Sequence, residues 1–352
     1  RRNHMTQLVI AFAGFGKSAN RYHLPYLKNR SQIKVKMVYD HRFRHYHEQQ
    51  DNLKASGVEL TTDFTDILED SDVQMIAITT PAATHYSLAK QALLHGKNIL
   101  VEKPFCETAE QAEELLKLAK ENGLIAMPFQ NRRFDSDYLA LKHVLEVGYV
   151  GEPLTIESHM DHFRPSEQFV NSDPINGQFY GLGIHTIDQI VALFGQPQRV
   201  FYDIRAQQNQ GTLDDYYETQ LFYPKLKAVV SSGPLVATPY PSFRLNGTKG
   251  SFVKYGIDQQ ENDLKAGIMP DQSDFGQDAP NAFGHLKYLN GNGDWIEKDL
   301  PTPVGDYGRV YDAMYAAIIE KKSKLVTDQE LLIDMRILEA GVSEQGPHVK
   351  EF

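Results

Sequence analysis

Cysteine is nearly absent from this sequence, since Cys106 is the only one among 352 residues. An intramolecular disulfide is therefore excluded, and a lone thiol is typical of a protein kept in a reducing compartment. We interpret Cys106 as a small apolar residue of the core rather than as a nucleophile.

Long apolar runs are absent as well. No stretch approaches the roughly 20 residues that a membrane-spanning helix requires, and the segment after Met5 resembles a strand rather than a signal peptide. Residues 1–4 precede this Met, and we interpret them as foreign to the natural chain. We therefore expect a cytoplasmic protein without a membrane partner.

Positive charge is in deficit, because 36 Lys and Arg residues face 46 Asp and Glu residues and leave a net charge of −10. Such a field repels phosphate backbones, so we expect no nucleic-acid partner. The remaining composition, with 41% apolar and 23% charged residues, is typical of a globular protein. The length is sufficient for about two domains.

Residues 5–130 alternate short apolar runs with helix-length segments, which predicts a doubly wound parallel sheet covered on both faces. The strands are expected at Leu8–Ala13, Ile33–Tyr39, Val73–Thr79, Ile99–Glu102 and Ile125–Phe129. Helices are expected at Thr84–His95, which Gly96 ends, and at Thr108–Asn122, where Thr108 and Gln111 form a capping box. This pattern predicts an α/β Rossmann domain.

Residues 131–352 have a different pattern, with short strands separated by turns. The strands are expected at Leu154–His162, Arg199–Arg205, Tyr216–Phe222, Leu226–Ser232, Phe243–Asn246 and Phe252–Tyr255. Helices are expected at Asp135–Glu146, Gln178–Phe194, Tyr307–Ile319 and Asp328–Ser343, and a long loop at Asp258–Pro280. We predict an α+β domain with an open, mostly antiparallel sheet.

A glycine turn follows the first expected strand directly and opens a helix. In Gly14-Phe15-Gly16-Lys17, followed by Ala19, the first glycine permits a tight turn and the second lets the backbone approach a pyrophosphate. The free N–H groups of the helix N-terminus then face the phosphate charge. The turn therefore predicts a dinucleotide site.

Asp40 ends the second expected strand, about 24 positions after Gly16. A carboxylate there can accept hydrogen bonds from the ribose hydroxyls and repels a 2′-phosphate, which favours NAD. Arg42 and Arg44 could instead bind that phosphate, so NADP stays open.

Two further clusters carry groups suited to chemistry. Lys103 follows Glu102 at the carboxyl end of a buried strand, where doubly wound sheets bind ligands. His185 and Asp188 share one helical face, and Gly181 and Gly183 precede them. The lysine is expected to project into the crevice at the strand ends, and the two glycines could let a flat ligand approach the histidine.

The chain resembles the glucose–fructose oxidoreductase / inositol dehydrogenase (Gfo/Idh/MocA) family over nearly its whole length. The matching residues are the Gly14-x-Gly16-x-x-Ala19 turn, His23-Leu24-Pro25, Thr80-Pro81 with His85, Glu102-Lys103-Pro104, Asn131-Arg132-Arg133-Phe134 and His185-Thr186-Ile187-Asp188. The resemblance implies hydride transfer between a nicotinamide and a carbinol carbon of a sugar, inositol or related polyol. It also implies a homodimer or homotetramer.

The same resemblance implies roles for individual residues. Lys103 matches the catalytic lysine that hydrogen-bonds the reacting oxygen, and His185 matches the general acid/base. The residues implied to lie along the cofactor are Gly14, Phe15, Gly16, Lys17, Asp40, Arg42, Thr80, Pro81, His85, Glu102, Lys103 and Asn131.

One departure from the family concerns Gly181, where many members carry an aspartate. Asp161 and Arg164 are candidates for the missing substrate contact, as is Asp188, for which anchoring of its helix is the simpler interpretation. The departure keeps open the alternative of a catalytically silent dinucleotide-binding sensor. The resemblance implies a further alternative, redox-assisted glycoside cleavage, which some relatives perform. No metal site is expected, because His159 and Asp161 share a strand face without a further ligand.

Overall fold

The computed structural model describes residues 6–44, 48–165, 173–208, 213–344 and 346–352. Its chain forms two compact units. The first unit comprises Arg1–Gln130 and Tyr307–Leu332, and the second comprises Asn131–Asp306 and Ile333–Phe352. The sequence placed residues 307–332 with the second domain, whereas here they pack with the first unit. Long-range contacts explain this, since Arg30 donates to Asp312 with Nε and Nη2 at 2.8 and 2.9 Å.

The first unit is built on a six-stranded parallel sheet in the order β3-β2-β1-β4-β5-β6. The strands are β1 Leu8–Ala13, β2 Ile33–Tyr39, β3 Glu59–Thr61, β4 Met75–Ile78, β5 Asn98–Val101 and β6 Ala126–Pro128. This order confirms the doubly wound fold and reverses direction between β1 and β4, the point at which such sheets bind ligands. The short strand β3, which the sequence pattern did not indicate, pairs with the end of β2.

The first unit contains the expected helices, Thr84–His95 and Thr108–Asn122, each one residue shorter at both ends, together with further α-helices. They are α1 Leu24–Leu27, α2 Glu48–Ala55, α3 Phe64–Glu69, α4 His85–Leu94, α5 Ala109–Glu121 and α9 Arg309–Ile318. At the start of α5, Thr108 accepts from the backbone N–H of Gln111, while the Gln111 side chain accepts from Glu107 rather than from Thr108. Across the described residues, no helix is both long and apolar enough to cross a membrane.

The second unit contains a nine-stranded sheet in the order β14-β13-β12-β11-β7-β10-β9-β8-β15. The strands are β7 Pro153–His159, β8 Arg199–Arg205, β9 Tyr216–Phe222, β10 Lys227–Ser232, β11 Phe243–Gly247, β12 Gly250–Lys254, β13 Gly284–Leu289, β14 Trp295–Leu300 and β15 His348–Glu351. Only β7 and β10 pair in parallel, so the sheet is mostly antiparallel, as predicted.

Two expectations for the second unit were wrong. Strands β13, β14 and β15 were missed, because their exposed faces alternate charged residues and carry few apolar ones. The expected loop at Asp258–Pro280 contains helix α8, Gln259–Lys265, whose first turn is stabilised because Asp258 accepts from the backbone N–H of Gln260.

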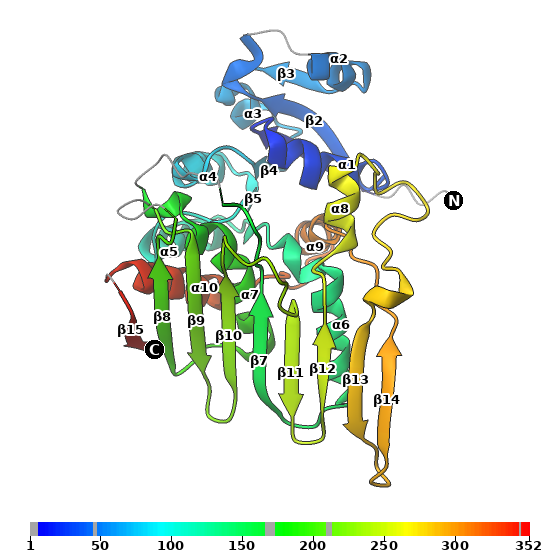
Figure 1. The fold of residues 1–352 in the computed structure, drawn as a ribbon. Helices are drawn as coiled ribbons and strands as arrows, with labels where there is room; N and C mark the ends of the chain where they lie inside the picture. The colour runs from blue at the N-terminus through cyan, green and yellow to red at the C-terminus, as the bar shows by residue number, and fades with distance from the viewer. Residues whose placement is uncertain (1–5, 45–47, 166–172, 209–212, 345) are drawn as a thin grey trace. The chain divides into compact units, whose positions relative to one another are not determined.

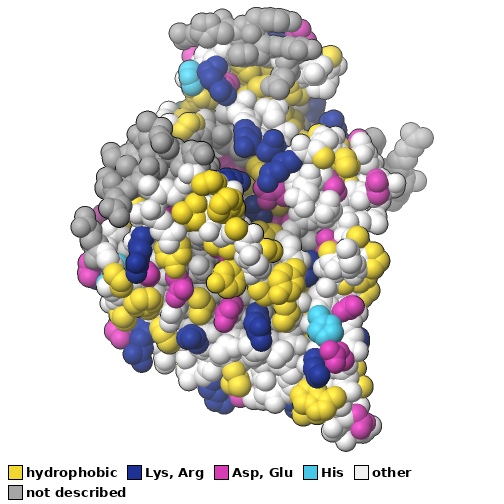
Figure 2. Space-filling view, in the orientation of Figure 1, with side chains coloured by type: hydrophobic (Ala, Val, Ile, Leu, Met, Phe, Trp, Pro, Cys, Tyr) yellow, Lys and Arg dark blue, Asp and Glu magenta, His cyan; other side chains and the backbone are white. Residues whose placement is uncertain are grey.

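Helices cover one face of this nine-stranded sheet. Helices α6 (Ser136–Val147), α7 (Ile184–Phe194) and α10 (Asp328–Val342, of which residues 333–342 belong to this unit) lie behind the strands in Figure 1. The register places Ile156, Ala228 and Leu221 side by side on the covered face, where all three are fully buried. The opposite face carries mixed apolar and charged side chains (Figure 2).

Candidate active site

The glycine turn of the first unit lies where β1 and β4 diverge. Gly14 has a φ of +104°, and a Cβ atom there would lie 2.9 Å from the carbonyl carbon of Thr79 and from the nitrogen of Thr80. The Thr79 hydroxyl donates to the Gly14 carbonyl at 2.9 Å. A side chain at position 14 would therefore force the two strand ends apart, and only glycine permits this close approach.

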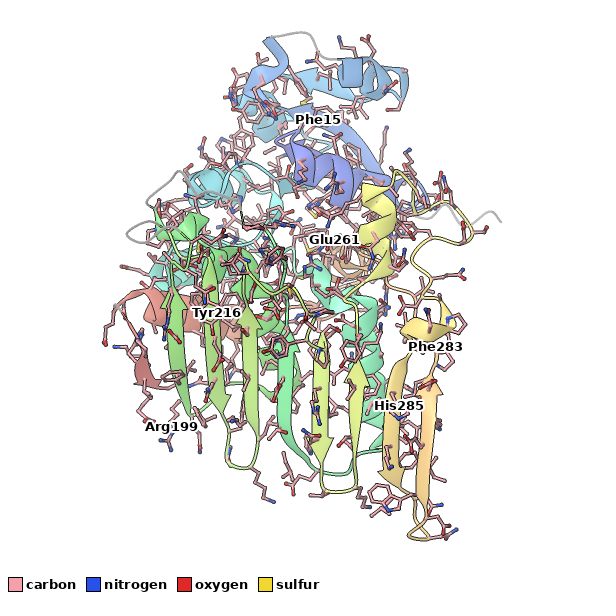
Figure 3. The ribbon with its side chains drawn as sticks, viewed as in Figure 1. Phe15, Arg199, Tyr216, Glu261, Phe283 and His285 are labelled. Carbon is pink, nitrogen blue, oxygen red and sulfur yellow. The ribbon has the colours of Figure 1, made fainter. Side chains whose placement is uncertain are left out.

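A cavity of about 580 Å³ opens beside this turn, a volume typical of cofactor sites. The predicted cofactor residues that line it are Gly14, Phe15, Gly16, Asp40, Arg42, Thr80 and Pro81. Phe15, labelled in Figure 3, follows β1 and packs its ring against Phe43 with centroids 5.6 Å apart. A Cβ built at Gly16 would have Arg42 Nη2, at 3.9 Å, as its one neighbour within 4 Å among the described residues. The exposed backbone of Gly16 therefore fits a pyrophosphate.

Asp40 is buried at the end of β2 and its carboxylate is fully engaged. It accepts from the backbone N–H groups of Phe15 and Arg42, each at 2.9 Å, and from Arg42 Nε and Nη2 at 2.9 and 2.7 Å. Burial alone would raise the pKa of Asp40, but the hydrogen bonds from Arg42 and Phe15 lower it to about 2. The side chain of Arg44 lies outside the described residues.

Glu102 and Lys103 follow β5 at the same carboxyl edge of the sheet. The buried Glu102 carboxylate accepts from His23 Nε2 at 2.9 Å, from the Ser18 hydroxyl, and through its other oxygen from the Lys103 backbone N–H at 3.0 Å. Burial would raise the pKa of Glu102, yet the His23 hydrogen bond and the charges of His23 and Lys103 lower it to about 2. Glu102 is therefore a carboxylate at neutral pH.

His85 holds two backbone segments together instead of lining the cavity. Its Nδ1 lies 2.8 Å from the carbonyl oxygen of Pro104 and its Nε2 lies 2.9 Å from that of Thr80. The side chain thus ties the Thr80-Pro81 loop to the turn after Lys103.

Two further predicted cofactor residues do not line the cavity. Lys17 is exposed after the glycine turn, and Asn131 belongs to the second unit.

In the second unit, His185 lies in the first turn of α7 and is buried. Asp188 is on the same helix, and its two carboxylate oxygens accept from Arg133 Nε and Nη2 at 2.8 and 2.7 Å. Since both carboxylate oxygens of Asp188 are engaged with Arg133, its contacts favour the anchoring role over a substrate contact.

The two glycines before His185 differ in their surroundings. A Cβ at Gly183 would lie 2.8 Å from Cδ2 of Phe179, so this glycine allows close packing. Among the described residues, no atom lies within 4 Å of a Cβ built at Gly181. Lack of space therefore does not explain why an aspartate is missing at position 181.

Asp161 continues the alternation of β7 and shares the uncovered face of the sheet with His159, whose Nδ1 is 3.2 Å from Asp161 Oδ2. Tyr216 of β9, labelled in Figure 3, lies on this uncovered face of the sheet as well. The covered face, against which α7 packs, carries Tyr217, whose hydroxyl is 3.0 Å from the Thr186 hydroxyl. The structure therefore places Asp161 and His185 on opposite sides of the sheet.

Arg164, the other substrate candidate, is exposed. Within the described ranges, no group of three or more His, Cys, Asp and Glu side chains is arranged to hold a metal ion.

Comparison with known families defines the class of protein. The model described as "Oxidoreductase family, NAD-binding Rossmann fold" matches residues 8–130, and that described as "Oxidoreductase family, C-terminal alpha/beta domain" matches residues 142–347. These matches define an oxidoreductase with a nucleotide-binding and a C-terminal domain. The chain belongs to the Gfo/Idh/MocA oxidoreductase family.

Individual relatives are similar over nearly the whole chain. The uncharacterized oxidoreductase YhhX of Escherichia coli is 46% identical over 96% of both chains. The scyllo-inositol 2-dehydrogenase (NADP(+)) IolW of Bacillus subtilis is 29% identical over 97% of this chain and 94% of its own. A crystal structure of an oxidoreductase from Bacillus cereus superposes with a TM-score of 0.95 at 50% identity, over 98% of this chain and 99% of that one.

Two residues next to the candidate site were not assigned a role from the sequence. His23 matched a family motif without a stated function, and Tyr311 lies in the helix expected at Tyr307–Ile319, from which it could reach the site although core is the commoner role of such a tyrosine. In the structure, Tyr311 and Glu102 flank the two nitrogens of the His23 ring. A histidine placed directly before Leu24-Pro25 and followed by a short helix was the only available signal.

Proposed function

We propose that the protein is an NAD(P)-dependent dehydrogenase that transfers hydride between the nicotinamide and a carbinol carbon of a sugar, inositol or related polyol. The observation that carries this proposal is the position of Lys103, held beside the buried Glu102 carboxylate in the unit that contains the dinucleotide cavity. The names of two relatives, scyllo-inositol 2-dehydrogenase and inositol 2-dehydrogenase, support the substrate class.

In the proposed reaction, the bound nicotinamide supplies the hydride acceptor and the chain supplies the proton chemistry. The Lys103 ammonium donates a hydrogen bond to the substrate hydroxyl and stabilises the negative charge that develops on its oxygen. His185 accepts the hydroxyl proton as hydride leaves the same carbon, so a carbonyl, a reduced nicotinamide and a protonated imidazole result. In the reverse direction His185 returns the proton.

For the cofactor we propose NAD, with NADP as the alternative. Asp40 is an anion that can accept ribose hydroxyls, which favours NAD. Arg42 must first leave the carboxylate, because it now occupies both oxygens. Titration of the protein fluorescence with NADH and NADPH tests this preference, since tighter binding of NADPH would contradict it.

The proposed partners are a small polyol or sugar and further copies of this chain, forming a homodimer or homotetramer. The uncovered face of the nine-stranded sheet (Figure 2) presents apolar and charged side chains together, which is typical of a surface that can pair with its own copy. Analytical ultracentrifugation tests this, and a monomer at micromolar concentration would contradict it.

A second candidate function rests on Gly181. A protein that binds a dinucleotide without catalysis could do without the aspartate that many relatives carry there, and no described atom lies within 4 Å of a Cβ at position 181. NADH binding without oxidation by any carbonyl in a broad panel would favour this sensor, while release of a free sugar without net NADH would favour redox-assisted glycoside cleavage.

The direct test of the proposed dehydrogenase uses the purified protein, both dinucleotides and a panel of inositols, aldoses and sugar acids. The Lys103→Met variant should lose turnover while its dinucleotide affinity stays within about twofold, because the lysine acts on the substrate oxygen rather than on the phosphates. Lys117→Met, at an exposed position on α5, is the matched control. Normal turnover by Lys103→Met would contradict the mechanism.

A further inference from the structure

A series of buried hydrogen bonds in the first unit leads to Glu102, the residue before Lys103. His23 is 1% exposed, with Nε2 2.9 Å from Glu102 Oε1 and Nδ1 2.6 Å from the hydroxyl of Tyr311. Tyr311 is fully buried in helix α9, which comes from the C-terminal part of the sequence. These hydrogen bonds therefore link helix α9 to the end of β5.

The chemistry of the carboxylate fixes the direction of the bond between His23 and Glu102. A carboxylate only accepts, so His23 Nε2 carries the hydrogen and donates it to Glu102. Burial and the nearby Glu102 charge raise the pKa of Tyr311 well above its ordinary value, so its phenol keeps the proton and can donate it to Nδ1. Each nitrogen of the His23 ring therefore has one partner: Nε2 donates to Glu102, and Nδ1 shares a hydrogen bond with the Tyr311 hydroxyl.

Aromatic packing fixes the ring that connects the two ends. His23 stacks on Phe129 with centroids 3.8 Å apart and an interplanar angle of 24°, and the edge of Phe12 meets it at 88°. Packing against Phe129 and Phe12 thus sets the plane of the His23 ring. The two hydrogen bonds set the orientation of the ring nitrogens within that plane. Such a ring transmits the position of the Tyr311 hydroxyl to Glu102.

Glu102 in turn holds the two segments from which the proposed site is built. Its Oε2 accepts from the Lys103 backbone N–H at 3.0 Å, and its Oε1 accepts from Ser18 in the segment that follows the glycine turn. A rotated carboxylate would lose these contacts and leave Lys103 with more freedom. Hydride transfer requires the ammonium within a hydrogen bond of the reacting oxygen, so this freedom would lower the rate.

We propose that Tyr311 and His23 are positioning residues for Lys103: they orient the Glu102 carboxylate through a Tyr311–His23–Glu102 relay. The relay rests on the proposed dehydrogenase function. It also accounts for the grouping of residues 307–332 with the first unit, because α9 delivers the hydroxyl that completes the relay.

The test compares Tyr311→Phe with Tyr307→Phe. Both tyrosines are fully buried and belong to the same C-terminal segment, but Tyr307 packs on Tyr22 and Tyr26, with ring centroids 6.1 and 5.5 Å away. Tyr311→Phe should lower kcat about threefold to tenfold, the effect of one lost hydrogen bond, with the dinucleotide Kd within about twofold. Tyr307→Phe should keep the wild-type kcat. An unchanged kcat in Tyr311→Phe, or an equal loss in Tyr307→Phe, would overturn the relay.

A second measurement does not depend on turnover. The rate at which an acylating reagent modifies Lys103, followed by peptide mass spectrometry, reports how firmly its ammonium is held. It should rise about threefold or more in Tyr311→Phe and stay unchanged in Tyr307→Phe, by the same hydrogen-bond estimate. If no polyol reacts yet this difference is found, the proposed function fails and the relay stands. If polyols react and the reagent modifies Lys103 at the wild-type rate in both variants, the relay is refuted while the proposed function stands.

Discussion

The guanidinium of Arg133 donates to both carboxylate oxygens of Asp188, at 2.8 and 2.7 Å, and both side chains are buried. Asp188 lies on helix α7, which also carries His185. Gln189, the next residue of α7, donates to the carbonyl oxygen of Arg132 at 2.7 Å. Two consecutive residues of the helix are thereby tied to one short segment. The orientation of α7, and with it the position of His185 within the second unit, depends on these contacts.

Removal of one partner of this pair should be costly. Asp188→Ala leaves Arg133 buried without its carboxylate, so we expect a loss of about 3–5 kcal/mol in the free energy of unfolding, measured by urea denaturation. The double change Arg133→Met with Asp188→Leu should recover most of the loss, because a well-packed apolar pair avoids burying charge. A polyol KM that rises strongly in the stable double variant would show that Asp188 contacts substrate instead.

Arg42 should control the choice of cofactor. In Arg42→Ala the Asp40 carboxylate is left facing the cavity without its guanidinium partner, so NADPH binding should weaken about tenfold or more through loss of a charge-assisted hydrogen bond. NADH binding should stay the same or tighten. Fluorescence titration of both dinucleotides measures the ratio, with Lys54→Ala, an exposed charge outside the cavity, as the control. An unchanged ratio would mean that Arg42 does not take part in the choice.

Asp214 should make the second unit less stable as pH rises. Burial raises the pKa of Asp214 to about 6, although its carboxylate accepts from the Phe179 backbone N–H at 2.6 Å. The folded state therefore binds a proton more tightly than the unfolded chain does, and stability is lost as pH rises from about 4 through 6. Asp214→Asn keeps an acceptor and removes the charge.

We expect Asp214→Asn to stabilise the protein by up to about 3 kcal/mol at pH 7 and by little at pH 4. Denaturation curves at a series of pH values give the difference directly. A stabilisation that does not change between pH 4 and pH 7 would contradict the raised pKa.

Position 181 should accept an aspartate that position 183 rejects. A Cβ at Gly181 meets no atom of the described residues within 4 Å, whereas one at Gly183 meets the Phe179 ring at 2.8 Å. Gly181→Asp should thus melt within about 2 °C of the wild type, and Gly183→Asp should melt well below it. The dinucleotide Kd of Gly181→Asp should stay unchanged while its KM values across the polyol panel change. If the KM values stay the same, position 181 does not face the substrate.

The sequence predicted strands that bury at least one face. Strand β1 was placed to the residue from an uninterrupted apolar run, and β2 from an apolar pattern that Lys34 and Lys36 interrupt. Strands β13 and β14 were missed because most of their side chains are exposed and charged, and few, such as Leu286, are buried and apolar. His285, labelled in Figure 3, lies 2.9 Å from both Glu297 and Asp299 on the opposite strand.

For the site, local patterns succeeded and long-range contacts were invisible. The glycine turn and Asp40 were found because each directly follows a strand that the local pattern predicts, the turn after β1 and Asp40 after β2. The relay was not found, because His23 meets partners 79 and 288 residues away along the chain. Likewise, the bond between Arg42 and Asp40 concerns neighbours, yet whether that arginine would turn inward or toward solvent depends on the folded surroundings.

The most direct test of the proposed hydride transfer follows one hydrogen. Inositols and aldoses carrying deuterium at one carbinol carbon are incubated with the protein and NAD or NADP, and the reduced dinucleotide is analysed by mass spectrometry. For one substrate and one labelled carbon, deuterium should appear at C4 of the nicotinamide, and Lys103→Met should transfer none. A protein that binds the dinucleotide but transfers deuterium from no labelled carbon, or that transfers it equally well without Lys103, would contradict the account.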